Sequence, residues 1–330
     1  MAMKQQERVN QLASLVEETL LPLINSDYVL YGLPNYTNVG DLLIWEGALA
    51  LLKKVPYKCK GVCSWNEYPA NDVAGNSIIL VLGGGYFGDV WRNAWQYVLE
   101  GIRFYRNNRI IILPMSIYYQ NETLKKADAD YLAGFNDLII CARDDSSFQL
   151  AKESFRNTVL LVPDLAWCND KAKLARWSQT SSDKVLLLKR CDKELVSDKI
   201  IIPESNVEVH DWPTIEYQTK SEILFERIIK LLRKIRRKWP WTGSFVKSLI
   251  DWLFYVFFRK QMISRGVSFI SSYDKIYTTR LHALILSVLL GKEVHIIDNS
   301  YGKLSACYET WLRDVEQVYV HEGDVEDGQL

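Results

Sequence analysis

The sequence predicts an α/β protein with two sheets, each in its own domain. Unbroken apolar runs such as Ile78 to Leu82 alternate with amphipathic helical segments, a pattern typical of parallel strands buried on both faces. At 330 residues the chain is long for a single hydrophobic core. Polar and charged residues directly follow several of the strands, and open α/β sheets bind their ligands at that edge.

The first domain is expected at residues 1–170, with a doubly wound sheet. An amphipathic helix should span residues 11–23, and a second helix should begin near Asp41. Gly83 to Gly85 follow a predicted strand, where backbone N–H groups can approach a ligand closely. A tight strand–helix turn is the alternative for these glycines. The predicted strands cover residues 28–33, 78–82, 109–114, 138–143 and 159–162.

Residues 171–183 are polar and are interpreted as a linker, which places the second domain at residues 184–330. Thr278 or Thr279 can cap the main helix of this domain, and Gly291 ends it. The predicted strands cover residues 185–188, 200–202, 207–210, 276–278 and 294–297.

Three cationic or titratable residues mark the clearest candidate site. Arg280 and His282 lie in the first turn of the predicted helix, and Lys303 lies in the loop after the next strand. Parallel strands bring both positions to the same sheet edge. The unpaired N–H groups and dipole of a helix N-terminus already favour an anion. The stretch therefore predicts a phosphate or carboxylate site; for His282 taken alone, a capping or surface role is the alternative.

Two further residues are candidates because of where they lie along the chain. Asp41 comes just after the turn residues Asn38 and Gly40, so it either faces a cleft or simply complements the helix dipole. Arg143 ends a predicted strand at the ligand edge, and a salt bridge to a neighbouring aspartate is its alternative role.

Composition limits the classes of partner. The 40 Lys and Arg balance 40 Asp and Glu, so net charge gives no support for a nucleic-acid partner. The polar start is unlike a secretory signal, and no apolar run reaches the length of a membrane span. Six scattered cysteines lack the spacing of a metal site, so no metal is expected, and reduced thiols in the cytoplasm fit best.

Residues 221–260 differ from the rest of the chain. A basic amphipathic stretch is followed by a Trp pair and a short aromatic run, a combination typical of a segment lying in a membrane interface. We expect this insertion to place the protein peripherally on the inner face of the cell membrane; a helix pair packed on the core is the alternative. The residues expected at the membrane are Arg233, Lys234, Arg236, Arg237, Trp239 and Trp241.

Four short motifs occur in an order that resembles the polysaccharide pyruvyl transferase family. The resemblance runs from about Gly32 to Trp311, whereas Glu204 to Gly266 match nothing in the family core. The motifs are Asn38-Val39-Gly40-Asp41, Leu82-Gly83-Gly84-Gly85, Ala142-Arg143-Asp144 with Ser146, and Thr279-Arg280-Leu281-His282-Ala283 with Lys303.

The resemblance implies two Rossmann-like domains facing a cleft, as in GT-B glycosyltransferases. It also implies phosphoenolpyruvate as donor, a sugar as acceptor, a pyruvate ketal as product and no cofactor. Arg143, His282 and Lys303 match the family's functional residues; Arg280, Asn38, Gly84 and Gly85 are expected to bind substrate with them. His282 is the expected proton donor and Asp41 the expected proton acceptor, because ketal formation needs both.

Two other functions remain open from the sequence. A GT-B glycosyltransferase using a nucleotide sugar would share the fold, the cleft and the histidine. A non-enzymatic subunit that tethers a glycan-assembly complex to the membrane would use the basic stretch equally well. The expected acceptor is a polyprenyl-diphosphate-linked glycan of surface polysaccharide biosynthesis, such as an exopolysaccharide or capsule.

Overall fold

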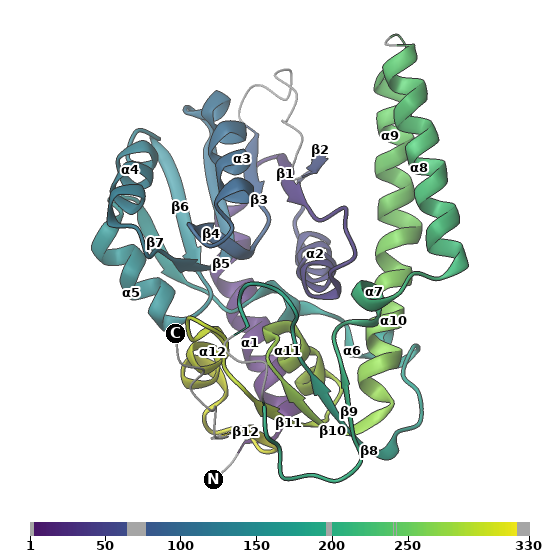
Figure 1. Ribbon diagram of the computed structural model, residues 1–330. Coiled ribbons are helices and arrows are strands. Elements are labelled where there is room, and N and C mark those ends of the chain that lie inside the picture. Colours follow the sequence, from purple (N-terminus) through teal and green to yellow (C-terminus); the bar gives the residue numbers. More distant parts are fainter. Residues whose placement is uncertain (1–2, 65–76, 196–199, 240, 242, 322–330) are drawn as a thin grey trace.

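The computed structural model describes residues 3–64, 77–195, 200–239, 241 and 243–321, and shows two parallel sheets (Figure 1). Seven strands of the described residues form the first sheet, in the order β2-β1-β3-β5-β6-β7 with β4 paired to β5. Their bounds are β1 Tyr28–Leu33, β2 Cys59–Ser64, β3 Ile78–Val81, β4 Gly84–Gly88, β5 Arg109–Tyr118, β6 Asp137–Ala142 and β7 Thr158–Leu161.

Five described strands form the second sheet, in the order β12-β11-β10-β8-β9. Counted along the chain this is the 2-1-3-4-5 order of doubly wound proteins, and the first sheet begins in the same way. Such sheets bind ligands where the strand order reverses, beside β1 and β3 or beside β8 and β10. The α/β prediction is confirmed. The strands are β8 Ser182–Leu188, β9 Val207–His210, β10 Tyr273–Thr278, β11 Glu293–Ile296 and β12 Val318–Val320.

Helices connect the strands and cover the sheets (Figure 1). The α-helices are α1 Gln5–Leu20, α2 Val39–Leu52, α3 Arg92–Ile102, α4 Glu122–Leu132, α5 Asp145–Ser154, α6 Lys171–Ala175, α7 Pro213–Glu216, α8 Lys220–Lys238, α9 Gly243–Leu253, α10 Arg259–Ser271, α11 Leu281–Leu289 and α12 Lys303–Cys307. The 3₁₀ segments are η1 Leu21–Leu23, η3 Arg103–Tyr105 and η4 Leu165–Cys168, and the π-helical segments are η6 Phe254–Phe258 and η7 Tyr308–Leu312.

The structure corrects several local predictions. Helix α1 starts six residues before the predicted position 11, because its buried stripe begins near its start, at Val9. Residues 200–202 form no strand; Ile200 and Ile202 instead pack against buried residues of the second sheet. The glycine stretch is partly a strand, since β4 pairs with β5. The predicted linker contains helix α6.

Helix α2 lies between the two sheets and contacts elements of both halves (Figure 1). Most of its residues are buried whichever side they point to, as expected for a helix that is apolar all round. It packs against η4 on one side and against α10 and α11 on the other. Helix α1 likewise contacts both η4 and α11, and Met3 pairs with Val315. The domain boundary at residue 170 stays a prediction.

Helices α8 and α9 form a hairpin that projects well beyond both sheets (Figure 1). The π-helical segment η6 and helix α10 continue the chain back to the body of the molecule. At this base the buried Arg259 forms an ion pair with Glu46 of α2 and lies over the Trp45 and Tyr255 rings. None of the helices in the described part of the chain is long and apolar enough to cross a bilayer.

Replacing Arg259 by Met should destabilise the protein by about 3 kcal/mol, because it leaves Glu46 buried with only Lys173 as a charged partner. Chemical denaturation should show a lower midpoint with an unchanged slope. Lys173→Met is the matched control and should cost under about 1 kcal/mol, because the Lys173 side chain is partly exposed. Equal effects of both substitutions would contradict this assignment.

Candidate active site

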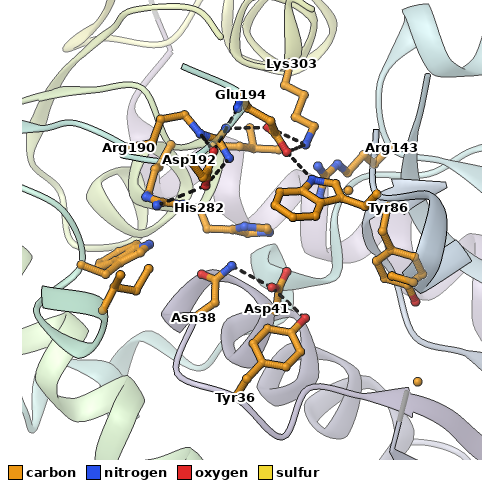
Figure 2. A pocket seen from close by; sticks show the side chains of 18 residues that line it. Tyr36, Asn38, Asp41, Tyr86, Arg143, Arg190, Asp192, Glu194, His282 and Lys303 are labelled. Carbon is orange, nitrogen blue, oxygen red and sulfur yellow. Dashed lines mark hydrogen bonds and ion pairs between the residues drawn. The ribbon is translucent and has the colours of Figure 1, made fainter. Parts of the chain in front are cut away.

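The candidate active site is a pocket of about 340 Å³ at the carboxyl ends of both sheets. Loops after β1, β8 and β10, strand β4, and the starts of α2, α11 and α12 supply most of its wall, at the edge that the strand order predicts. In Figure 2, His282 lies between the Asn38 and Asp41 side chains on one side and the group around Glu194 and Lys303 on the other.

Glu194 is the centre of a buried charge cluster. Its carboxylate accepts hydrogen bonds from Lys303 Nζ at 3.0 and 3.1 Å, Arg190 Nη1 at 2.5 Å and Trp91 Nε1 at 2.6 Å. Burial alone raises the pKa of Glu194, but the charges of Lys303 and Arg190 and the bonds to Trp91 and Lys303 lower it to about 2. Burial also lowers the pKa of Lys303, to about 8, although Glu194 opposes this change. The pair is charged at neutral pH.

Lys303 lies at the first position of α12 and not in the predicted loop. Its ammonium group approaches Gly85, since a Cβ added to Gly85 would lie 2.6 Å from Lys303 Nζ and 3.3 Å from Arg143 Nη2. Because Gly85 has no side chain, both cations can approach its backbone closely. Gly84, its predicted partner, is absent from the pocket wall and packs instead against the Tyr86 ring.

Asp164 joins residues from the two halves of the chain. Its Oδ2 accepts a 2.8 Å hydrogen bond from Arg143 Nη1 and lies 3.5 Å from His282 Nε2. All three side chains are nearly buried. Burial raises the pKa of Asp164, but His282 and Arg143 outweigh it and lower that pKa to about 2. A charged carboxylate thus faces the imidazole.

Arg280 occupies another part of the pocket wall. Its Nε and Nη2 donate to Asp211, the latter at 2.5 Å, and Nη2 lies 3.5 Å from Asp192. Arg280 itself is the residue before α11, so neither threonine caps this helix. Thr278 Oγ1 accepts from the Arg280 backbone N–H, and Thr279 Oγ1 accepts from the Arg190 backbone N–H.

The start of α2 forms the opposite wall. Asn38 caps this helix by accepting from Gly40 N, and its Nδ2 donates to Asp41 Oδ2 at 2.7 Å. Tyr36 donates to the same oxygen at 3.0 Å. A Cβ on Gly40 would lie 2.5 Å from His282 Nδ1, so glycine is needed where α2 meets α11. The Asp41 carboxylate is thus fixed by two hydrogen bonds, and it lines the pocket together with His282.

Sequence reasoning identified Arg143, Arg280 and Lys303 but missed Arg190 and the carboxylate partners of these cations. Asp164 lies three residues after the end of β7 and Arg190 two residues after the end of β8, so their position at the ligand edge was a usable signal. Asp192 and Glu194 lie in an irregular loop with no such signal. The predicted membrane residues lie on α8 and at the tip of the hairpin, and none lines the pocket described here.

Residues 38–301 match the family described as polysaccharide pyruvyl transferase. The chain belongs to this family. The match confirms the resemblance seen in the motifs and makes the chain a transferase, which removes the non-enzymatic alternative.

Similar proteins agree with this assignment to the polysaccharide pyruvyl transferases. EpsO of Bacillus subtilis (strain 168), which is named as a pyruvyl transferase, is 30% identical over 89% of this chain and 86% of its own length. Pyruvyl transferase 1 of Schizosaccharomyces pombe is 22% identical over 86% of this chain and 69% of its own length.

One solved structure shows the same fold. The crystal structure of a functionally uncharacterized protein from Klebsiella pneumoniae matches with a TM-score of 0.61 at 17% identity. The match covers 94% of this chain and 98% of that one.

Stability should fall in acid as Asp164 becomes protonated. The unfolded chain takes up this proton near pH 3.8 and the folded chain near 2, so the stabilisation is complete above about pH 5 and is lost as the pH falls towards 2. The contribution is about 2 kcal/mol. Asp164→Asn should reduce the fall in the denaturation midpoint across this pH range. Asp145→Asn, at an exposed site, is the control. An unchanged pH dependence in Asp164→Asn would contradict the assignment.

Proposed function

We propose that this pyruvyl transferase moves the pyruvyl group of phosphoenolpyruvate onto two hydroxyls of a sugar, forming a pyruvate ketal. The observation that carries the proposal is the convergence of Arg143 Nη2 and Lys303 Nζ on Gly85, in the same pocket as His282 and Asp41. Phosphoenolpyruvate carries a phosphate and a carboxylate, and several fixed cations are the partners such a ligand needs. The two sheets would form a GT-B-like pair of domains.

In the donor site, the main anion contacts are assigned to Arg143 and Lys303, with Arg190 beside them. Arg143 is held from behind by Asp164 and by Ser116, whose hydroxyl accepts from Nε at 2.9 Å. Those bonds leave Nη2 directed toward Gly85. Arg280 adds positive charge on another wall, where Asp211 already holds it. The cations are fixed before the donor arrives, which favours binding through preorganisation.

The reaction can be written with every proton placed. His282 gives a proton to the methylene carbon of the donor, and C2 becomes oxocarbenium-like. A sugar hydroxyl attacks C2 and gives its proton to Asp41, whose carboxylate lines the same pocket. The C2–O bond to phosphate then breaks, and the second hydroxyl closes the ring, its proton leaving with the phosphate. His282 and Asp41 lie on facing helix starts, as transfer in opposite directions requires.

The direct test is incubation of the protein with phosphoenolpyruvate and lipid-linked sugars, followed by mass spectrometry. Phosphate release together with a mass gain on the sugar equal to one pyruvic acid less one water supports the proposal. Transfer from a nucleotide sugar, with no reaction of phosphoenolpyruvate, would overturn it in favour of a glycosyltransferase.

Lys303→Ala should weaken donor binding about tenfold or more, because a charge-assisted contact contributes roughly 1.5–3 kcal/mol. Arg143→Ala and Arg280→Ala should also weaken it. Gly85→Ala should displace the Lys303 ammonium group and lower donor affinity while the fold is kept, since its new Cβ meets the flexible end of Lys303 at 2.6 Å and Arg143 Nη2 at 3.3 Å. Calorimetry with phosphoenolpyruvate measures each effect.

The control for the donor-site variants is Gly83→Ala, whose Cβ would lie 2.3 Å from the Pro114 carbonyl oxygen and outside the pocket wall. It should lower stability and leave the donor affinity of the folded fraction unchanged. Wild-type affinity in all of the donor-site variants would contradict the assignment.

His282→Gln should keep the fold and the donor affinity but lower turnover by about 10²–10⁴-fold, because it removes the proton donor. Turnover and donor affinity are measured on the same preparation. Near-normal turnover with weaker donor binding would make His282 a binding residue instead.

The hairpin supports the proposal that the acceptor is lipid-linked and that the protein lies on the cytoplasmic membrane face. Leu224, Ile228 and Leu231 form an exposed stripe on α8, and Trp241 and Phe245 at the tip are 84% and 74% exposed. Basic residues share the helix, and each adds about 1 kcal/mol near an anionic surface. Amphipathic helices of this kind lie in the headgroup region. A surface-bound enzyme meets a lipid-linked sugar in two dimensions.

Changing Arg233, Lys234, Arg236 and Arg237 to Glu should release the protein from anionic liposomes, because the charge attraction reverses. Flotation at low salt measures the bound fraction. The control changes four exposed basic residues elsewhere to Glu: Arg103, Lys126, Lys152 and Arg156. The control should float as wild type does, and a wild-type protein that stays soluble would contradict the membrane proposal.

A further inference from the structure

The mouth of the pocket carries apolar side chains that the reaction scheme does not use. Tyr36, Trp91 and Ile215 line the pocket and remain 38%, 36% and 41% exposed. They come from three separate segments: the loop before α2, the turn before α3 and helix α7. A single exposed hydrophobic residue needs no explanation, but three around one pocket mark a surface for a ligand.

The polar atom of each aromatic ring at the pocket mouth donates a hydrogen bond to a carboxylate. Trp91 Nε1 donates to Glu194 at 2.6 Å, and Lys193 Nζ lies 4.2 Å from the centre of the ring. Tyr36 donates its hydroxyl proton to Asp41 at 3.0 Å. Because the polar atom of each ring is already bound to protein, what remains for a ligand is apolar ring surface. That surface is fixed before any ligand binds.

The Asp41 side of the pocket, where Tyr36 lies, does not suit the donor, and Trp91 faces it from the Glu194 side, across His282. Asp41 would repel an anionic ligand, but it accepts hydrogen bonds readily. Tyr36 and Asn38 both donate to Oδ2 of Asp41, so among the described residues Oδ1 has no hydrogen-bond partner and is available to a hydroxyl. Apolar ring faces beside a hydrogen-bond acceptor fit a neutral pyranose, which has C–H faces and hydroxyl edges.

We propose that Tyr36 and Trp91 form the acceptor subsite, holding one pyranose ring with neighbouring hydroxyls directed at Asp41. This assignment rests on the proposed transfer from phosphoenolpyruvate. A volume of about 340 Å³ is near the lower end for small-molecule sites. The pocket thus holds the donor and one sugar ring, and the remainder of the acceptor lies outside, beyond Ile215.

The test compares ring removal with ring exchange, using methyl pyranosides of galactose, glucose and mannose as probes in the presence of phosphoenolpyruvate. Saturation-transfer NMR titrations measure sugar affinity without turnover, and calorimetry measures donor affinity separately. Trp91→Ala should weaken sugar binding about tenfold, whereas Trp91→Phe keeps a ring and should stay within about threefold. Tyr36→Ala and Tyr36→Phe should behave in the same way. Trp252→Ala, on the hairpin, is the control and should bind sugar as wild type does.

Each possible result supports or overturns either the sugar subsite or the proposed donor. Equal losses in Trp91→Phe and Trp91→Ala would show that only the bond to Glu194 matters and would overturn the subsite, as would wild-type sugar affinity in Trp91→Ala. Absence of binding by every methyl pyranoside would also overturn it. If the wild type binds these sugars through Trp91 but does not bind phosphoenolpyruvate, the proposed donor fails while the sugar site stands.

Discussion

The buried carboxylate of Asp164 is the interaction on which the site depends. It belongs to the first half of the chain, and it faces both Arg143 from that half and His282 from the other. Removing the carboxylate would leave the buried Arg143 guanidinium without its charged partner, which is a costly arrangement. One side chain therefore contacts an arginine and a histidine that come from the two halves of the chain.

The other cations of the pocket are also paired with buried carboxylates. Arg190 and Lys303 share Glu194, and Arg280 is held by Asp211. A cluster of unpaired arginines and lysines would repel itself in a buried site, and bound carboxylates remove that repulsion before a substrate arrives. In the proposed donor site, phosphoenolpyruvate would be recognised by N–H groups that these carboxylates leave available, such as Arg143 Nη2, and not by an excess of charge. The proposal thus needs no net positive charge on the chain.

The sequence allowed the α/β class, most strands and the site cations Arg143, Arg280 and Lys303 to be predicted, because each depends on local pattern, whereas Arg190 was missed. Apolar runs mark buried strands, and strand order places the residues that follow them at one edge. The predictions that failed concern features that depend on contacts between residues far apart in the sequence. The early start of α1 comes from packing with the C-terminal half, and the strand β4 exists because β5 lies beside it. Glu194 gave no signal, since its partners Arg190, Trp91 and Lys303 come from three segments.

The burial of helix α2 limits how the sequences of such proteins can diverge. It carries Asn38, Gly40 and Asp41 at one end and Glu46 further along, and nearly all of its surface is buried. Almost no position on it is open to neutral drift, so mutational tolerance along this helix should be very low. The outer faces of α8 and α9 contact solvent and can accept change without disturbing the chemistry. Relatives can thus adapt to new surroundings through the hairpin while the catalytic framework is inherited intact.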